Sequence, residues 1–259
     1  MASTGDKQAE PGSEQERDVL PQDIVVCYGV TNDTPEYPLY AARSIYSLVR
    51  RNPGVGISLY EGPRGKHPWG IRAKAIVPAP WVIVLDADTW VNGDVRGLLP
   101  GADEDLALRV ANVWNQRDAV FGTRKRRHWH QEDWEHICSW LGVPVVPLYT
   151  TGIVAFRGVL ALEVKDNWEV LRAKVCRAGR RGKIKDPLHL PGRDPWWMAN
   201  MYAMSLLISE RGWRVRELHK AEVSWNFRAG EHGGIVHHLG KKRNPFDPKR
   251  WPNFRSPTS

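Results

Sequence analysis

The fold of this chain is decided by the segment WVIVLDADT at positions 81–89, a short apolar run that ends in two aspartates. Val82 to Leu85 are aliphatic without polar alternation, which is typical of a central strand buried on both of its faces. Asp86 and Asp88 then stand where such a strand reaches the surface. In open α/β sheets ligands bind beyond the carboxyl ends of the strands, so the two aspartates mark a candidate site.

The aspartate pair has two interpretations. Carboxylates two residues apart repel each other unless a cation lies between them, and a hard divalent ion with oxygen ligands is the usual solution. The alternative is a solvated turn that closes the strand, because Asp is a common turn former. The apolar residues that end at Leu85 and resume at Trp90 place the pair between buried segments, which favours the metal site.

Length and composition bound the class of protein. A chain of 259 residues is long enough for one sizeable domain, and we expect a disordered tail at 1–20 and a single domain at 21–259. The net charge of +8 predicts affinity for anions, whether nucleotide phosphates, nucleic acid or an acidic membrane surface. The three scattered cysteines support neither a disulfide framework nor a zinc site, which favours a reducing compartment.

Membrane and targeting signals are absent from the sequence. No run approaches the roughly 20 apolar residues that span a bilayer, and the polar N-terminus lacks the apolar core of a signal peptide. We therefore expect a soluble cytoplasmic protein, with peripheral membrane contact left open.

Strand and helix patterns alternate along the chain. A strand at 23–28, a helix at 40–49 and a strand at 55–60 form a β-α-β unit. Further strands are predicted at 106–111, 151–156, 213–218 and 235–243, and helices at 69–75, 134–141, 159–177 and from Asp194 onward. The predicted fold class is α/β, a single Rossmann-like domain with a mostly parallel central sheet flanked by helices.

A basic and aromatic segment, TRKRRHWH at 123–130, lies in the least regular part of the sequence. Interleaved cations and aromatic rings can grip an acidic or sugar partner, or single-stranded nucleic acid. A solvated basic loop is an equally weighted alternative.

Three separated pieces of sequence suggest one constellation. They are the aspartate pair, the two histidines His237 and His238 near the end of a late strand, and the basic segment 240–243. A divalent ion held by two carboxylates and an imidazole, with cations and backbone amides nearby, forms a pyrophosphate clamp. This is the chemistry that a nucleotide-activated donor requires.

In these pieces and their order, the sequence resembles the metal-dependent GT-A glycosyltransferases, most closely the branch that contains glycogenin and the bacterial lipopolysaccharide galactosyltransferases. The resemblance runs from about Asp23 to Pro245. The segment LDADTWV at 85–91 resembles the D-x-D motif of the family, and HHLG at 237–240 resembles its His-x-x-Gly motif. TTGIVAF at 150–156 stands where the family has the strand that lines the sugar. The resemblance implies a GT-A fold.

The resemblance also implies site residues. Asp86, Asp88 and His237 would hold Mn²⁺ or Mg²⁺, and Asp194 would be the catalytic residue near the anomeric carbon, although Asp before Pro is also an ordinary helix cap. Residues that line the sugar would be Thr151 and Gly152. Contacts to the donor are expected from Thr31, Asn32, Tyr37, Asp86, Ala87, Gly240, Lys242 and Arg243, and the position of Lys74 before the aspartate strand suggests one more cation or a solvated residue.

The expected function is hexosyl transfer from a nucleotide sugar, with a UDP-sugar favoured, to an unknown glycan, lipid or protein acceptor. The ion would assist departure of the nucleoside diphosphate, and the resemblance implies retention of anomeric configuration. A nucleotidyltransferase is the first alternative, but it commonly carries a Gly-rich loop with cations after its first strand, whereas GVTND at 29–33 has none. The other two alternatives are a nucleic-acid-binding protein and a family member that binds the donor without transferring its sugar.

Overall fold

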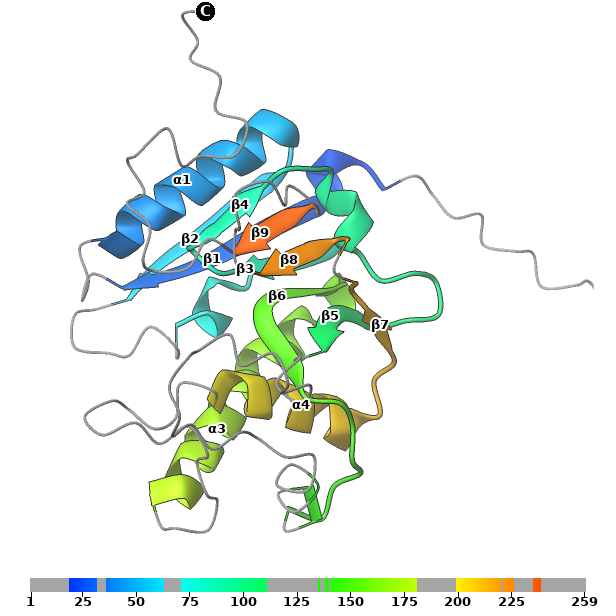
Figure 1. Ribbon diagram of the computed structural model, residues 1–259. Coiled ribbons are helices and arrows are strands. Elements are labelled where there is room, and N and C mark those ends of the chain that lie inside the picture. Colours follow the sequence, from blue (N-terminus) through cyan, green and yellow to red (C-terminus); the bar gives the residue numbers. More distant parts are fainter. Residues whose placement is uncertain are drawn as a thin grey trace, which may run out of the picture.

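The computed structural model describes residues 19–31, 36–62, 71–110, 135, 138–139, 141–180, 199–219, 221–225 and 235–238 (Figure 1). The predicted tail at 1–20 and the basic segment at 123–130 lie outside these residues, apart from the last two positions of the tail. Among the described helices, none combines the length and the apolar character that a bilayer crossing requires.

A six-stranded sheet forms the centre of the molecule, with the order β2-β1-β3-β6-β5-β7. Three of its five strand pairings are parallel, and β6 runs antiparallel to both of its neighbours. The predicted mostly parallel α/β sheet is therefore confirmed. The strands are β1 (Ile24–Thr31), β2 (Gly56–Gly62), β3 (Trp81–Leu85), β5 (Leu106–Val110), β6 (Tyr149–Arg157) and β7 (Val215–Glu217).

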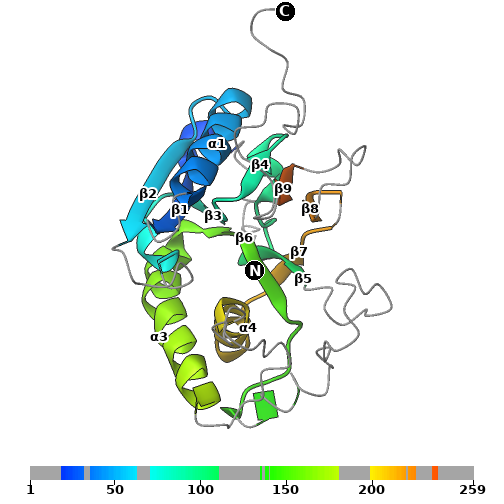
Figure 2. The same cartoon turned by 60° about the vertical axis from the view of Figure 1, so that its left-hand side comes forward.

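Helices cover both faces of this sheet (Figures 1 and 2). The helix α1 (Glu36–Arg51) lies on one face, and α3 (Ala161–Arg180) and α4 (Ala199–Arg211) lie on the other. Val82 and Val84 of β3 join the core cluster of α3 and α4, whereas Ile83 and Leu85 join the cluster that contains Leu48 of α1. The side chains of Val82 to Leu85 are at most 1% exposed, which confirms the predicted strand buried on both faces.

The other predicted helices are only partly covered by the described residues. In place of the end of the helix predicted at 69–75 there is a single 3-10 turn, η3 (Ala73–Ala75). The helix predicted from Asp194 is described only from Ala199 onward, as α4. The remaining 3-10 turns are η1 (Pro21–Asp23), η4 (Val95–Leu98) and η6 (Gly158–Leu160).

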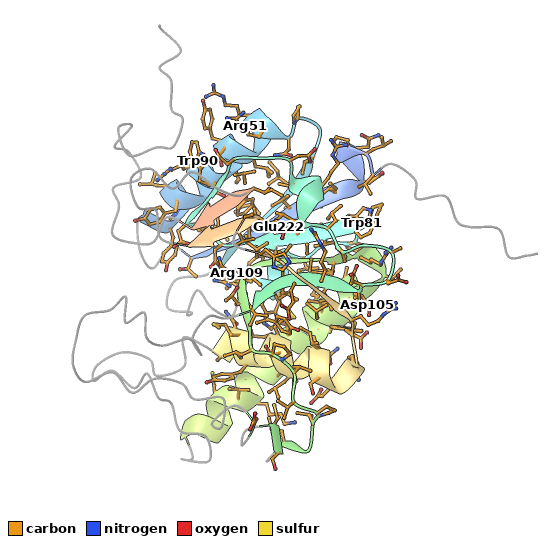
Figure 3. The ribbon with its side chains drawn as sticks, turned by 45° about the vertical axis from the view of Figure 1, so that its right-hand side comes forward. Arg51, Trp81, Trp90, Asp105, Arg109 and Glu222 are labelled. Atoms are coloured by element: carbon orange, nitrogen blue, oxygen red, sulfur yellow. The ribbon has the colours of Figure 1, made fainter. Side chains whose placement is uncertain are left out.

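A second sheet of three short strands lies beside α1, with the order β4-β9-β8. Its strands are β4 (Thr89–Val91), β8 (Val223–Trp225) and β9 (Val236–His238), of which only β9 falls in a strand predicted from the sequence. Arg109 of β5 donates a hydrogen bond from Nη1 to the carbonyl of Val223, so a buried guanidinium links the two sheets (Figure 3). Burial lowers the pKa of Arg109.

Candidate active site

Asp86, Ala87 and Asp88 form a tight turn between β3 and β4. The amide of Asp86 donates to the carbonyl of Gly152 on β6 at 2.9 Å. The amide and the hydroxyl of Thr89 both donate to the carbonyl of Asp86, at 3.2 and 2.8 Å. Ala87 is buried, whereas both aspartates are partly exposed. The turn therefore carries two partly exposed carboxylates on a backbone that is hydrogen-bonded on both sides.

A line of hydroxyl groups connects this turn to the helix α1. Thr89 Oγ1 lies 2.8 Å from Ser44 Oγ, and Ser44 Oγ lies 3.1 Å from the hydroxyl of Tyr28. Burial raises the pKa of the Tyr28 hydroxyl above its usual value, which favours the protonated form. Because these groups are buried, their hydrogen bonds fix the turn relative to β1 and α1.

Arg72 supplies a cation to the site among the described residues, and no sequence pattern marked it. Its guanidinium forms an ion pair with Asp86 through Nη2 and Oδ1. Nη1 donates to the backbone carbonyl of Thr151 at 2.8 Å and lies 3.2 Å from Thr151 Oγ1. The predicted cation Lys74 is exposed, and its Nζ lies 5.6 Å from the centre of the Tyr60 ring on β2. The only signal in the sequence was a second cation two residues before Lys74.

Gly29 of β1 explains how Arg72 reaches the site. A Cβ atom on Gly29 would lie 2.8 Å from Cα and 2.9 Å from N of Arg72, closer than real Cβ contacts allow. The backbone of Arg72 therefore rests directly on β1 at this glycine. In the parallel register of β1 and β3, Tyr28 faces Leu85, so Gly29 is next to the position of Asp86. The glycine thus leaves the space that the arginine occupies.

The other described site residues surround this centre. Thr151 is buried on β6 and contacts Arg72, and Gly152 contacts Asp86 through its carbonyl. Tyr37 packs against a small cluster that contains Ala87. Thr31, at the end of β1, is fully buried, and its Oγ1 has no hydrogen-bond partner among the described residues. A buried hydroxyl without a partner is uncommon, and a ligand is one way to satisfy it.

The late histidines lie on the strand next to the aspartate turn. In the antiparallel register of β4 and β9, His238 faces Thr89 and His237 faces Trp90. The backbone therefore brings the predicted metal ligand His237 to the strand that begins directly after Asp88. The predicted residues Asn32, Asp194, Gly240, Lys242 and Arg243 lie outside the described residues, and their roles stay predictions.

The donor atoms of the turn are suited to a divalent ion. Within the described residues there is no group of three His, Cys, Asp or Glu side chains that could hold a metal. The two carboxylates of the turn supply the hard oxygen atoms that Mg²⁺ and Mn²⁺ prefer. A carboxylate has two oxygens and about four lone-pair directions, so the ion pair with Arg72 does not exhaust the binding capacity of Asp86. The two carboxylates suit such an ion, whereas the side chain of His237 lies outside the described part of the chain and its role as a third ligand stays a prediction.

Comparison with known proteins identifies the fold. No family model and no curated protein matches the sequence. Among solved structures, the apo structure of the WbbM bifunctional glycosyltransferase is 14% identical and has a TM-score of 0.53 over 90% of this chain and 48% of that chain. The chain has the GT-A fold. This confirms the resemblance at the level of the fold, and the α/β class with it.

Two further solved structures are similar to this GT-A chain. The glycosyltransferase GlyE of Streptococcus pneumoniae TIGR4 is 12% identical, with a TM-score of 0.48 over 89% of this chain and 57% of that one. The galactosyltransferase LgtC, in complex with donor and acceptor sugar analogs, is 10% identical, with a TM-score of 0.47 over 84% of this chain and 87% of its own. The chain spans about half the length of WbbM and of GlyE.

Proposed function

We propose that the protein is a glycosyltransferase that moves a hexose from a nucleotide sugar, with a UDP-sugar as the preferred donor, to a glycan, lipid or protein acceptor. The observation that carries this proposal is the Asp86–Asp88 turn at the carboxyl end of β3, with a buried guanidinium beside it, in a GT-A fold. This edge of an α/β sheet is where ligands bind. Carboxylates beside a fixed cation suit a metal-bound diphosphate and a sugar.

The reaction requires a diphosphate to leave while the anomeric carbon gains positive charge. In this proposal Asp86, Asp88 and His237 hold Mn²⁺ or Mg²⁺, which neutralises charge on the leaving phosphates when bound. Arg72 donates hydrogen bonds to the donor from a fixed planar guanidinium, the geometry that suits phosphate and sugar oxygens. Thr151 and Gly152 line the sugar, as part of the same proposal.

The remaining roles rest on the resemblance and on single observations. The buried hydroxyl of Thr31 would hydrogen-bond the nucleoside, with Asn32, Tyr37 and Ala87 around it. Asp194 would stabilise the anomeric centre, and retention of configuration is the stereochemical outcome that we propose. The remaining proposed donor contacts are Lys74, Gly240, Lys242 and Arg243.

The test is a calorimetric titration with a panel of nucleoside diphosphates and nucleotide sugars, with and without Mn²⁺. The variant is Asp88→Asn, and the matched control is Asp94→Asn, an aspartate shortly after β4 whose carboxylate pairs with the exposed Arg96. We expect Mn²⁺-dependent binding of one nucleotide sugar to wild type and control. In Asp88→Asn we expect binding at least about tenfold weaker, the effect of 1.4 kcal/mol.

Two outcomes would contradict the proposal. One is that no nucleotide sugar binds to the folded wild-type protein at millimolar concentration. The other is that Asp88→Asn binds the nucleotide sugar as tightly as the control does. Release of nucleoside diphosphate from the bound donor, measured on the same three proteins, then tests whether binding leads to chemistry.

A further inference from the structure

The guanidinium of Arg72 is a fixed positive charge beside the carboxylate of Asp86, which is proposed to bind a metal ion. The guanidinium contacts Asp86 on one side and the Thr151 carbonyl on the other. We propose that this charge opposes binding of a bare divalent ion, so that the site takes the ion together with a diphosphate as one complex. This inference rests on the proposed function, because it concerns the same two aspartates.

The first step of the argument is that Arg72 is held in place. The residue is 9% exposed, and its backbone rests on β1 at Gly29, where no side chain could fit. Its Nη1 group is fixed by Thr151, a residue of the central strand β6. A long side chain that is anchored at both ends loses little further entropy when a ligand binds. Moving it away would break hydrogen bonds inside the protein.

The second step is electrostatic. A divalent ion that binds Asp86 must share the carboxylate with the guanidinium, and the two cations would then lie a few ångströms apart. Like charges at such a distance repel strongly where solvent is largely excluded. The carboxylates of Asp86 and Asp88 together carry two negative charges, whereas the divalent ion and the guanidinium together carry three positive charges. Binding of the ion alone is therefore unfavourable.

The third step is the effect of a diphosphate. Its negative charges interact favourably with the ion and with the guanidinium at once, so the excess of positive charge disappears. Charge-assisted hydrogen bonds from Arg to phosphate oxygens are among the strongest in proteins. With the anion present, the charge of Arg72 no longer opposes binding of the ion and instead stabilises the bound metal–diphosphate complex. The site discriminates in favour of the metal–diphosphate complex and against the free ion.

The experiment measures Mn²⁺ binding by the electron paramagnetic resonance signal of the free ion, with the full chain and without any sugar donor. Arg72→Met removes the charge and keeps much of the apolar length, whereas Arg72→Lys keeps the charge. We expect Arg72→Met to bind Mn²⁺ alone about tenfold more tightly than wild type, and Arg72→Lys to resemble wild type. In the double variant that combines Arg72→Met with Asp88→Asn, the gain in Mn²⁺ affinity should be abolished.

The matched control is Arg157→Met. Arg157, at the far end of β6, also donates from a partly buried guanidinium to backbone carbonyls, those of Gly101 and Glu104. Its loss should leave Mn²⁺ binding unchanged. If Arg72→Met does not fold, as judged by its melting transition, Arg72→Gln keeps a donor for Thr151 and removes the charge, with the same expected gain.

The inference would be overturned if the charge-removing variant bound Mn²⁺ alone no more tightly than wild type. It would equally be overturned if wild type bound Mn²⁺ alone as tightly as it does with UDP present. These outcomes differ from failure of the proposed function, in which neither wild type nor any variant binds Mn²⁺ with UDP, or Asp88→Asn leaves that binding intact.

Discussion

At the scale of single residues, Arg72 and Lys74 illustrate how two similar cations acquire different positions. They are two residues apart, and one rests against Asp86 while the other lies over Tyr60. Both side chains carry one positive charge, so charge does not decide between them. The 3-10 turn η3 and the missing Cβ of Gly29 decide it, because they bring the backbone of Arg72 onto β1.

The hydroxyl of Thr151 supplies one prediction at this scale. Thr151→Val keeps the shape of the side chain and removes a hydrogen-bond acceptor of Arg72, whose loss costs about 0.5–1.5 kcal/mol, or roughly a threefold to tenfold effect. We expect the kcat/KM for the nucleotide sugar to fall by that factor. The control is Thr150→Val, the same change at the neighbouring buried threonine of β6. Equal kcat/KM values for the two variants in steady-state kinetics would refute this role.

At the scale of elements, α1 is the element to which the aspartate turn and the small sheet are attached. The hydroxyl of Ser47 accepts the amide of Val91 in β4 at 2.9 Å. Asn52, just after the helix, accepts the amide of Val95 at 2.9 Å and donates to the carbonyl of Gly93 at 3.1 Å. These polar contacts hold the segment after the turn, so the geometry of the site depends on the end of a helix far from it in sequence.

Asn52→Ala tests this attachment. The change leaves the buried amide of Val95 without its acceptor, which costs about 1–3 kcal/mol. We expect the free energy of unfolding, measured by urea denaturation, to fall by that amount. Asn167→Ala serves as the control, because Asn167 donates to the carbonyl of Glu163 within its own helix. A change below 0.5 kcal/mol in Asn52→Ala, or one equal to that of the control, would argue against this attachment.

At the scale of the whole molecule, burial of both faces of the sheet also determines the response to pH. Cys27 of β1 is fully buried, and this burial raises the pKa of its thiol from 9.0 to about 11. The folded state keeps the proton between these two values, whereas the unfolded state loses it. The contribution of the Cys27 thiol to the free energy of unfolding is therefore fully present below about pH 9 and is lost as the pH rises to about 11.

The expected loss is about 2–3 kcal/mol of unfolding free energy across this pH interval. In Cys27→Ala the unfolding free energy should be lower at pH 8 but should decline less steeply between pH 9 and 11. Val26→Ala, a core truncation on the same strand without a titrating group, should keep the steep decline of wild type. Denaturation curves at a series of pH values check this. Parallel slopes for the two variants would mean that the thiol of Cys27 does not contribute.

The sequence by itself determined the β-α-β unit, the strand β3 and the place of the aspartates at its end. These are local consequences of a hydrophobic run that must be covered on both faces. The resemblance added the GT-A fold, which the structure confirms.

Only the tertiary structure decided the antiparallel insertion of β6 between β3 and β5, the small sheet, and the choice of Arg72. β4 and β8 have three residues each and, unlike β7 and β9, do not lie within a longer strand pattern of the sequence, so no local signal marks them. The contact between Gly29, Arg72, Asp86 and Thr151 joins four separate segments, and such a contact exists only when the chain has folded.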